Sequence, residues 1–371
     1  MANEDKATRY HRLQRRASLL ATAAGAVLLL LMVVTGLSVA IRAVAERLAA
    51  GVLPFTVIGY VFLVFLLYEV TQTPFAYYQG VVLERRYGLS TETRQHWWMN
   101  HAKAAGLGVI FAAVAAVLIV ALVRWSPAWW WAAAAAVFVV ILVGLAQLAP
   151  VVLLPLFYDV MPLNRPQLVE RLVALAERSG ARVIGVFEWR LSDRTRKANA
   201  ALTGVGRTRR ILLSDTLLAE HSDDEIEVIL AHELAHHVHR DIWTGIALET
   251  VLIAAGFFVA DKALSMFAHS FGLAGKGDVA ALPILLLAAG AVSVLFLPLA
   301  NGLSRAHERR ADRYALRMTR NADAFVTAMK RLAVQNLAEE QPSRIVEWLL
   351  HSHPSTRSRI EAARRWAAEH S

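Results

Sequence analysis

The chain has 371 residues and a formal net charge of +9. Of these residues, 56% are hydrophobic, and none is a cysteine. Its mean hydropathy of +0.42 is too high for an ordinary soluble protein, and its apolar residues gather in long runs, so the sequence indicates a mainly α-helical, polytopic membrane protein. The lack of cysteine excludes disulfides, thiolate catalysis and cysteine-ligated metals. The sequence has no nucleic-acid-binding motif, and we attribute its positive charge to membrane topology and anionic lipid headgroups.

Residues 1–158 are predicted to form an N-terminal membrane domain with four transmembrane helices. The first apolar run, residues 17–41, carries no charge and is long enough to cross about 30 Å of hydrocarbon. A basic leader and the triplet Ala43-Val44-Ala45 raise the alternative of a cleaved signal peptide, but the run exceeds the ~7 to 15 apolar residues of such a peptide, so we expect a retained anchor. Three more spans are predicted at about residues 52–77, 104–123 and 128–154, the last with a bend at Pro150.

Residues 159–371 are predicted to form a second domain that includes two further spans, at about residues 242–260 and 279–303. Between the fourth and fifth spans, the pattern predicts a helix at residues 167–178, a strand at 183–189, and a hairpin of residues 198–202 and 209–213 around Gly204-Val205-Gly206. An edge strand close to a catalytic site can align a peptide by adding it to the sheet.

The stretch from His232 to His236 has the HExxH pattern. Residues four apart share one face of a helix, so His232 and His236 can direct ring nitrogens at one zinc ion. Glu233 then lies beside the metal as the base that accepts a proton from zinc-activated water. Ser222 to Glu225 is a predicted capping box, so a helix starts about ten residues before His232. The alternative is a histidine-rich solvated helix face.

Catalytic zinc needs a third protein ligand. The metzincin pattern requires glycine and histidine at positions that here hold His239 and Ile242, so that class is excluded. Glu308 and Asp312 are four residues apart, so one carboxylate can bind the metal while the other orients a ligating histidine. The alternative is that Glu308 pairs with neighbouring arginines on an exposed helix.

The distribution of basic residues predicts the topology. Of the 39 lysines and arginines, 34 fall before the first span, in residues 84–103 and 165–240, and after residue 303. Five precede the first span and two follow it, so the positive-inside rule places both termini and the zinc site on the cytoplasmic side. Glu69 and Glu249 lie within predicted spans, where a carboxylate faces either a watery cavity or an interface.

Several motifs occur in the order of a known family, the type I CAAX prenyl endopeptidases, which the chain resembles over roughly residues 74 to 360. The matching stretches are Glu84-Arg85-Arg86-Tyr87-Gly88-Leu89, Asn199-Ala200 before a Gly-x-Gly turn, Arg210 to Leu218, the HExxH stretch, Ser304-Arg305-x-x-Glu308-x-x-x-Asp312, and His353-Pro354 with Arg359-Ile360.

The resemblance implies a ring of transmembrane helices, six by our prediction, around a chamber, with a zincin-like α+β catalytic domain that the charge distribution places on the cytoplasmic side. It implies one zinc ion per chain and cleavage of peptides or membrane proteins. Three groups of site residues follow by matching position: the ligands His232, His236 and Glu308; the catalytic residues Glu233, His353 and Asp312; and the substrate-binding residues Asn199, Ala200 and Arg359.

The chain departs from the eukaryotic members, which have seven spans, because we predict six. Its alanine- and arginine-rich composition indicates a bacterium and therefore the inner membrane, where a membrane-associated or lipid-modified peptide is the expected substrate. The first alternative is a membrane quality-control metalloprotease of the heat-shock type. The second is a non-catalytic membrane scaffold with a bound metal, which would have no need of Glu233. The sequence does not predict an oligomeric state.

Overall fold

The computed structural model describes residues 5–148, 152, 154–204, 208–267 and 269–370. Within these residues, six helices are long and apolar enough to cross a membrane, as the sequence predicts. Their bodies are α1 (Lys6–Val34), α3 (Leu53–Tyr77), α5 (Arg94–Trp125), α6 (Trp130–Leu148), α11 (Asp241–Phe267) and α12 (Leu282–Thr319). The expected mainly α-helical, polytopic architecture is therefore confirmed.

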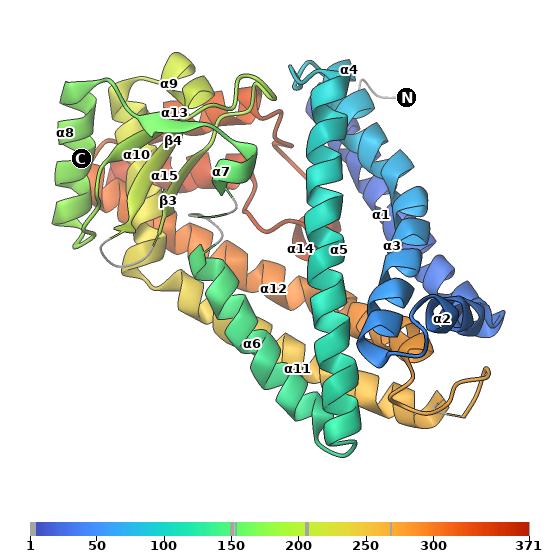
Figure 1. Ribbon diagram of the computed structural model, residues 1–371. Coiled ribbons are helices and arrows are strands. Elements are labelled where there is room, and N and C mark those ends of the chain that lie inside the picture. The colour runs from blue at the N-terminus through green and yellow to red at the C-terminus, as the bar shows by residue number, and fades with distance from the viewer. Residues whose placement is uncertain (1–4, 149–151, 153, 205–207, 268, 371) are drawn as a thin grey trace.

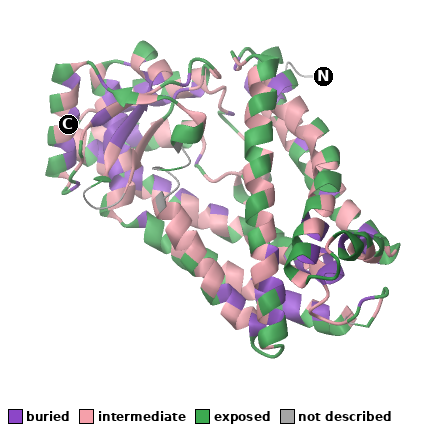
Figure 2. Ribbon diagram, viewed as in Figure 1, coloured by how far each residue is buried: buried purple, intermediate pink, exposed green. Residues whose placement is uncertain are grey.

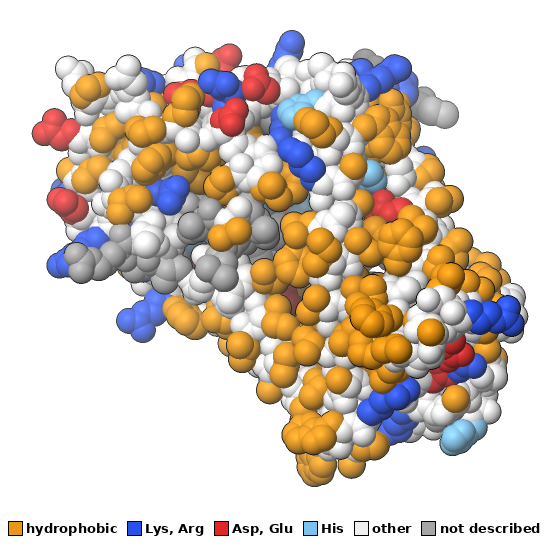
Figure 3. Space-filling model, in the orientation of Figure 1, with side chains coloured by type: hydrophobic (Ala, Val, Ile, Leu, Met, Phe, Trp, Pro, Cys, Tyr) orange, Lys and Arg blue, Asp and Glu red, His pale blue; other side chains and the backbone are white. Residues whose placement is uncertain are grey.

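Two groups of these helices meet at one end of the molecule and diverge towards the other (Figure 1). Helix α3 packs against α1 and α5, whereas α11 packs against α12 and α6. The N-terminus, α4 (Glu84–Arg86) and the domain with the sheet all lie at the divergent end. Figure 2 shows buried residues gathered in that domain and at the convergent end. The exposed apolar side chains of the long helices, orange in Figure 3, are suited to contact with lipid.

The first predicted span is interrupted. Helix α1 ends at Val34, Gly36 adopts a left-handed φ of 73°, and the 12-residue helix α2 (Leu37–Leu48) follows. Glycine adopts this conformation without steric cost, so the chain turns here and α2 packs against α3. The prediction of one continuous span over residues 17–41 is therefore wrong, because hydropathy alone does not detect a turn between two apolar helices.

Short helical segments connect the spans. The π-helical segment η1 (Tyr78–Leu83) joins α3 to α4, α7 (Leu154–Phe157) follows α6, and the 3₁₀ segment η4 (Val279–Ala281) precedes α12. The predicted bend at Pro150 lies outside the described residues. Glu69 of α3 pairs with His101 of α5 at 3.0 Å, and both are half-buried, so this acidic residue has a partner at membrane depth.

The small sheet has the strand order β1-β2-β4-β3. Its strands are β1 (Val160–Pro162), β2 (Val186–Trp189), β3 (Ala200–Thr203) and β4 (Arg210–Ser214). β3 and β4 are antiparallel, which confirms the predicted hairpin, although residues 205–207 of its turn lie outside the described residues. Within the described part of the chain, β3 has β4 as its one partner, so its other side is an edge of the sheet.

Helix α10 (Asp223–Val238) lies at the centre of the domain and positions the site. It packs against α8 (Pro166–Arg178), α12, α13 (Ala322–Gln335) and the edge strand β3. Its residues Leu230 and Leu234 are fully buried in one core together with Leu172, Ile211 and Phe325, and this burial determines how α10 is rotated. The remaining helices are α9 (Asp215–Glu220), α14 (Arg344–Leu350) and α15 (Thr356–His370).

Candidate metal centre

The helix with the HExxH stretch begins at the predicted capping box. Ser222 Oγ accepts a hydrogen bond from the Glu225 amide, and the Glu225 carboxylate accepts one from the Ser222 amide, so two amides at the start of α10 are satisfied. The core side of α10 is buried around Leu234. His232 and His236 therefore lie on the adjoining stripe, where α10 meets α12.

The carboxylates predicted beside the metal lie on an extension of the last span. Helix α12 is continuous over Leu282–Thr319 and runs several turns past the predicted end of that span at residue 303. Asn301, Arg305, Glu308 and Asp312 are all buried along it. Their spacing of three or four residues places them on one face of the helix, so α12 both anchors the domain and presents its acidic groups to α10.

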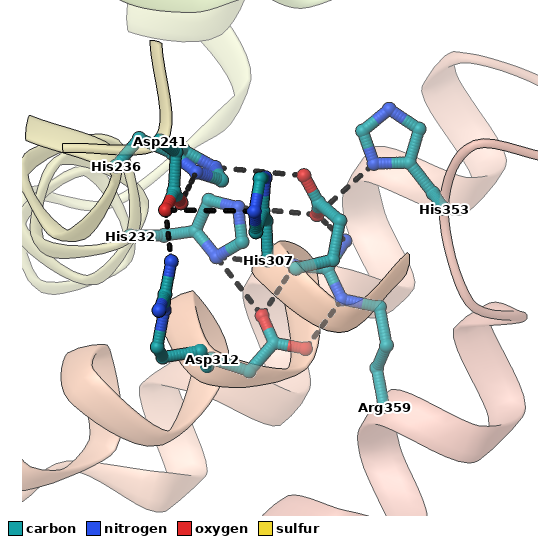
Figure 4. A network of polar contacts seen from close by, with 9 residues as sticks. His232, His236, Asp241, His307, Asp312, His353 and Arg359 are labelled. Atoms are coloured by element: carbon teal, nitrogen blue, oxygen red, sulfur yellow. Dashed lines mark hydrogen bonds and ion pairs between the residues drawn. The ribbon is translucent and has the colours of Figure 1, made fainter. Parts of the chain in front are cut away.

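Three side chains converge between α10 and α12, within the polar network of Figure 4. His232 Nε2 lies 3.3 Å from Glu308 Oε2, and His236 Nε2 lies 3.5 Å from Glu308 Oε1. One ligand atom from each of the three residues lies within 4.8 Å of the other two, which allows all three to share one metal ion. The structure thus brings together the three residues that the sequence nominates as ligands.

The other nitrogen of each histidine contacts a carboxylate. His232 Nδ1 lies 2.9 Å from Asp312 Oδ1, as the sequence predicts for Asp312. His236 Nδ1 lies 2.8 Å from Asp241 Oδ2, and the Arg310 guanidinium binds the same carboxylate. The sequence interpretation missed Asp241. The available signal was an acidic residue directly after the HExxH helix, at the point where the chain turns into α11.

The donor set fits a metal cation. An imidazole that donates its Nδ1 proton to a carboxylate presents the lone pair of Nε2, and here both Nε2 atoms face Glu308. Glu308 Oε2 is buried and receives no hydrogen bond of good geometry from the described residues. Burial lowers the pKa of His232, but Asp312 and Glu308 outweigh burial and raise that pKa to about 9. The cluster therefore favours a positive charge at its centre.

Arg359 lies behind this cluster. Its guanidinium donates to both carboxylate oxygens of Asp312, at 2.8 and 2.5 Å, and Nη1 is 3.9 Å from Glu308 Oε2 (Figure 4). A bidentate contact of this kind holds the Asp312 carboxylate in one orientation towards His232. The guanidinium of Arg359, which the sequence analysis assigns to substrate binding, thus contacts the carboxylate that lies beside His232.

His353 lies at the open side of the cluster. Its Nδ1 is 3.0 Å from Glu308 Oε2, and its side chain is 63% exposed. The loop that carries it, between α14 and α15, is held by Arg305 of α12, which donates to the carbonyl oxygens of Glu347 and His351 at 2.9 and 2.5 Å. The sequence interpretation did not assign this loop-positioning role to Arg305.

The edge strand β3 lies beside the cluster. Ser214 of β4 donates its amide proton to the Asn199 carbonyl, and the Asn199 amide donates to Ser214 Oγ, both at 2.9 Å. Asn199 and Ala200 thus mark the beginning of β3. A cavity of about 710 Å³ lies between this strand and α10. It is lined by Leu202 of β3 and by Glu233 and His236 of α10.

A second cavity lies on the other side of the cluster. It has a volume of about 490 Å³, and His353 and Arg359 are among its lining residues. Since His236 and Glu233 line the first cavity and His353 the second, the three converging side chains lie between two spaces that an extended peptide could occupy.

Two family models together match nearly the whole chain. The model of peptidase family M48 matches residues 162–367. The model described as CAAX prenyl protease N-terminal, five membrane helices, matches residues 2–159. Among the described residues of that region, five helices have 12 or more residues, and α2 is the additional helix that the sequence interpretation did not predict.

The relatives are proteases. The chain is 30% identical over 318 residues to the uncharacterized metalloprotease YhfN of Bacillus subtilis (strain 168), covering 83% of this chain and 73% of that protein. It is 26% identical over 308 residues to CAAX prenyl protease 1 of Saccharomyces cerevisiae, covering 78% and 68%. Protease HtpX of Legionella pneumophila (strain Corby) is 27% identical over 232 residues, covering 56% and 79%.

The fold also has a solved counterpart. The crystal structure of Ste24p from S. mikatae superposes with a TM-score of 0.86 at 22% identity, covering 96% of this chain and 88% of that one. The arrangement of membrane helices and sheet is therefore shared with that protein across almost the full length.

Proposed function

The chain belongs to peptidase family M48 and is a membrane metalloprotease, and from this premise we propose that His232, His236 and Glu308 hold one zinc ion per chain. The observation that carries the proposal is the convergence of three ligand atoms within 4.8 Å. Three protein ligands leave one position open, as in catalytic zinc sites, whereas structural sites have four. When bound there, zinc would acidify a water molecule and polarise the peptide carbonyl.

We assign Glu233 as the general base. It lies next to His232 on α10 and lines the cavity on the β3 side. Burial raises the pKa of the Glu233 carboxyl above its usual value, which makes the carboxylate a better proton acceptor. Its role is to take a proton from the attacking water and to deliver it to the leaving amine.

The substrate is proposed to bind as an added strand along β3. In an antiparallel ladder, successive residues turn their amide and carbonyl alternately towards and away from the partner strand. Since Asn199 is bonded to Ser214 of β4, Ala200 and Leu202 present theirs to the open edge. A peptide paired with that edge would pass the Glu233 carboxylate in an extended conformation.

His353 and Arg359 are proposed to act in different ways. His353 is exposed and 3.0 Å from Glu308, so its ring can donate a hydrogen bond to the oxyanion that forms at the scissile carbonyl. Arg359 orients Asp312, which orients His232, and Asp312 thus supports catalysis through the histidine. Direct contact of Arg359 with substrate, as predicted from the sequence, is the alternative.

The proposed substrates are membrane-associated or lipid-modified peptides. Two observations support this class: the chain matches CAAX prenyl protease 1 of yeast over 78% of its length, and the candidate site lies where α10 leads into the spanning helix α11. The match to protease HtpX keeps membrane quality control as the second candidate. We propose a bacterial inner membrane, with the domain at residues 159–371 and both termini cytoplasmic, from the distribution of basic residues.

The test compares membranes that contain the wild-type protein with membranes that contain Glu233→Gln. Mass spectrometry of the peptides that differ between them identifies cleavage products and their parent proteins. We expect products with new termini from membrane-associated proteins in the wild-type sample only. Identical peptide populations in the two samples would count against the proposed function.

A further inference from the structure

The cavity on the β3 side contains basic residues that the proposed mechanism does not use. We name it the Arg209 cavity and define it by Thr203, Arg209, Glu233, His236, Arg240 and Trp243. It measures about 710 Å³. Because Glu233 and His236 line it, any molecule in this space lies directly beside the catalytic groups.

Two guanidinium groups in this cavity have no partner within the described part of the chain. Among the residues that the structure describes, neither the Arg209 nor the Arg240 side chain makes a hydrogen bond or an ion pair. Arg209 is nevertheless half-buried. By contrast, Arg310 binds Asp241 and Arg359 binds Asp312. A partly buried arginine without a carboxylate partner, next to a peptidase site, is suited to an anionic group that arrives with a ligand.

In the cavity on the other side of the ligand cluster, the described residues include no unpaired arginine. Its Arg15 pairs with Glu339 at 2.5 Å, and its Arg359 pairs with Asp312 at 2.5 Å. The two cavities therefore differ in charge: the arginines of one are neutralised by ion pairs, whereas the other has two guanidinium groups with no partner among the described residues. This asymmetry would orient a charged peptide along the site.

The edge strand leads towards the free arginines. β3 runs from Ala200 to Thr203, and Thr203 lies opposite Arg210, so Arg209 lies just beyond the end of β3. A peptide that pairs with the open edge of β3 would have one end beside Thr203, in the Arg209 cavity. Its backbone would reach this cavity after passing Glu233.

We propose that Arg209 and Arg240 bind a carboxylate of the substrate peptide at the Thr203 end of β3 and thereby determine specificity. The inference rests on the proposed function, because it requires that a peptide occupies the β3 edge. The carboxylate is either the C-terminal group of the peptide or the side chain of an aspartate or glutamate. Arginine binds both in the same bidentate geometry.

An anionic lipid headgroup is the competing occupant, because Ile242 and Trp243 at the rim are 53% and 55% exposed. The structure favours the peptide, since the cavity is continuous with Glu233 and His236 and borders the edge strand. The two occupants predict different measurements. A bound lipid would change the cleavage of all peptides equally, whereas recognition of a peptide carboxylate would favour only the peptides that contain one.

The experiment uses the full-length protein in nanodiscs of neutral lipid and internally quenched octapeptides of alanine and leucine. One peptide ends in an amide, a second ends in a free acid, and the others carry a single aspartate or asparagine at each position. Cleavage is measured for the wild-type protein, and peptide binding for Glu233→Gln protein. Both measurements are repeated after Arg209→Gln and Arg240→Gln have been introduced together into the corresponding protein. Arg182→Gln is the matched control, because Arg182 is exposed and lies outside both cavities.

We expect one peptide with a carboxylate to be bound and cleaved about 10- to 100-fold better than its amide or asparagine counterpart. The double arginine variant should lose this advantage and keep its activity on the neutral peptide, whereas Arg182→Gln should keep both. Comparison of the free-acid peptide with the aspartate peptides identifies which carboxylate is bound.

Three results would overturn the inference: no advantage for any carboxylate, an advantage that survives in the double variant, or an equal loss on all peptides that is reversed by adding anionic lipid. Failure of the wild-type protein to exceed Glu233→Gln in cleavage would instead contradict the proposed function. The binding measurements would still decide whether the arginines recognise a carboxylate.

Discussion

The Nδ1 atom of His236 lies 2.8 Å from the Oδ2 atom of Asp241, the first residue of the helix that follows. The same contact joins His232 to Asp312, from a different part of the chain, at 2.9 Å. Both imidazoles are thus oriented by carboxylates so that their Nε2 atoms face Glu308. A carboxylate in this position fixes the tautomer and raises the basicity of a metal-binding histidine.

Substitution of Asp241 by asparagine should weaken zinc binding about 10- to 100-fold, because the amide is a poorer partner for His236. Competition with a chromophoric chelator measures the affinity. Asp193→Asn is the control, since Asp193 is exposed and has no partner among the described residues. Equal affinities for both variants would show that Asp241 does not support the site.

Substitution of Glu308 by alanine should remove most of the bound zinc, because two histidines alone do not hold a catalytic zinc ion. Metal analysis of the purified protein measures occupancy. The exposed residue Glu340 offers the matched control, Glu340→Ala, which should retain one zinc ion per chain. Full occupancy in Glu308→Ala would remove Glu308 from the ligand set.

Substitution of Glu233 by glutamine should lower kcat by about 10² to 10⁴ while zinc content and melting temperature stay unchanged, because the amide has the size of the carboxylate but cannot accept a proton. Turnover of a cleavable peptide and metal analysis on the same preparation measure both properties. A variant as active as the wild-type protein would refute the assignment of the base.

Replacement of His353 by alanine should lower kcat by about 10² to 10³ without loss of zinc, since one donor to the oxyanion is removed. The ring is 63% exposed, so its loss should have little effect on stability. Kinetics and thermal unfolding of His353→Ala and His353→Asn distinguish a role as oxyanion donor from a structural role. An unchanged kcat with a lowered melting temperature would make His353 structural.

N-methylation of successive amides in a substrate peptide should inhibit cleavage at every second position. The reason is that a strand paired with β3 directs alternate amides to the open edge of Ala200 and Leu202 and the others away from it. The KM of each methylated peptide is the measurement. Inhibition without this alternation would contradict binding as an added strand.

Local patterns in the sequence were sufficient for the membrane class and for part of the site. Hydropathy located the six spans because each is a long, strongly apolar run with at most one charged residue, and the helical period placed His232 and His236 on one face. The capping box at Ser222 also formed as predicted, since its two hydrogen bonds join residues three apart. Hydropathy failed at Gly36, where the conformation of a single residue divides one apolar run into two helices.

Contacts between distant segments were decided only by the tertiary structure. The sequence nominated Glu308 as a ligand, but its approach to the histidines depends on how α12 packs against α10. Asp241 reaches His236 because the chain turns after α10, and Arg305 contacts a segment that follows it by about 40 residues. Periodicity in the sequence does not predict contacts of this kind. Likewise, Arg209 and Arg240 become neighbours of Glu233 only when β3, α10 and α11 enclose one cavity. Sequence spacing determines which side chains share a helix face, whereas packing determines which faces meet.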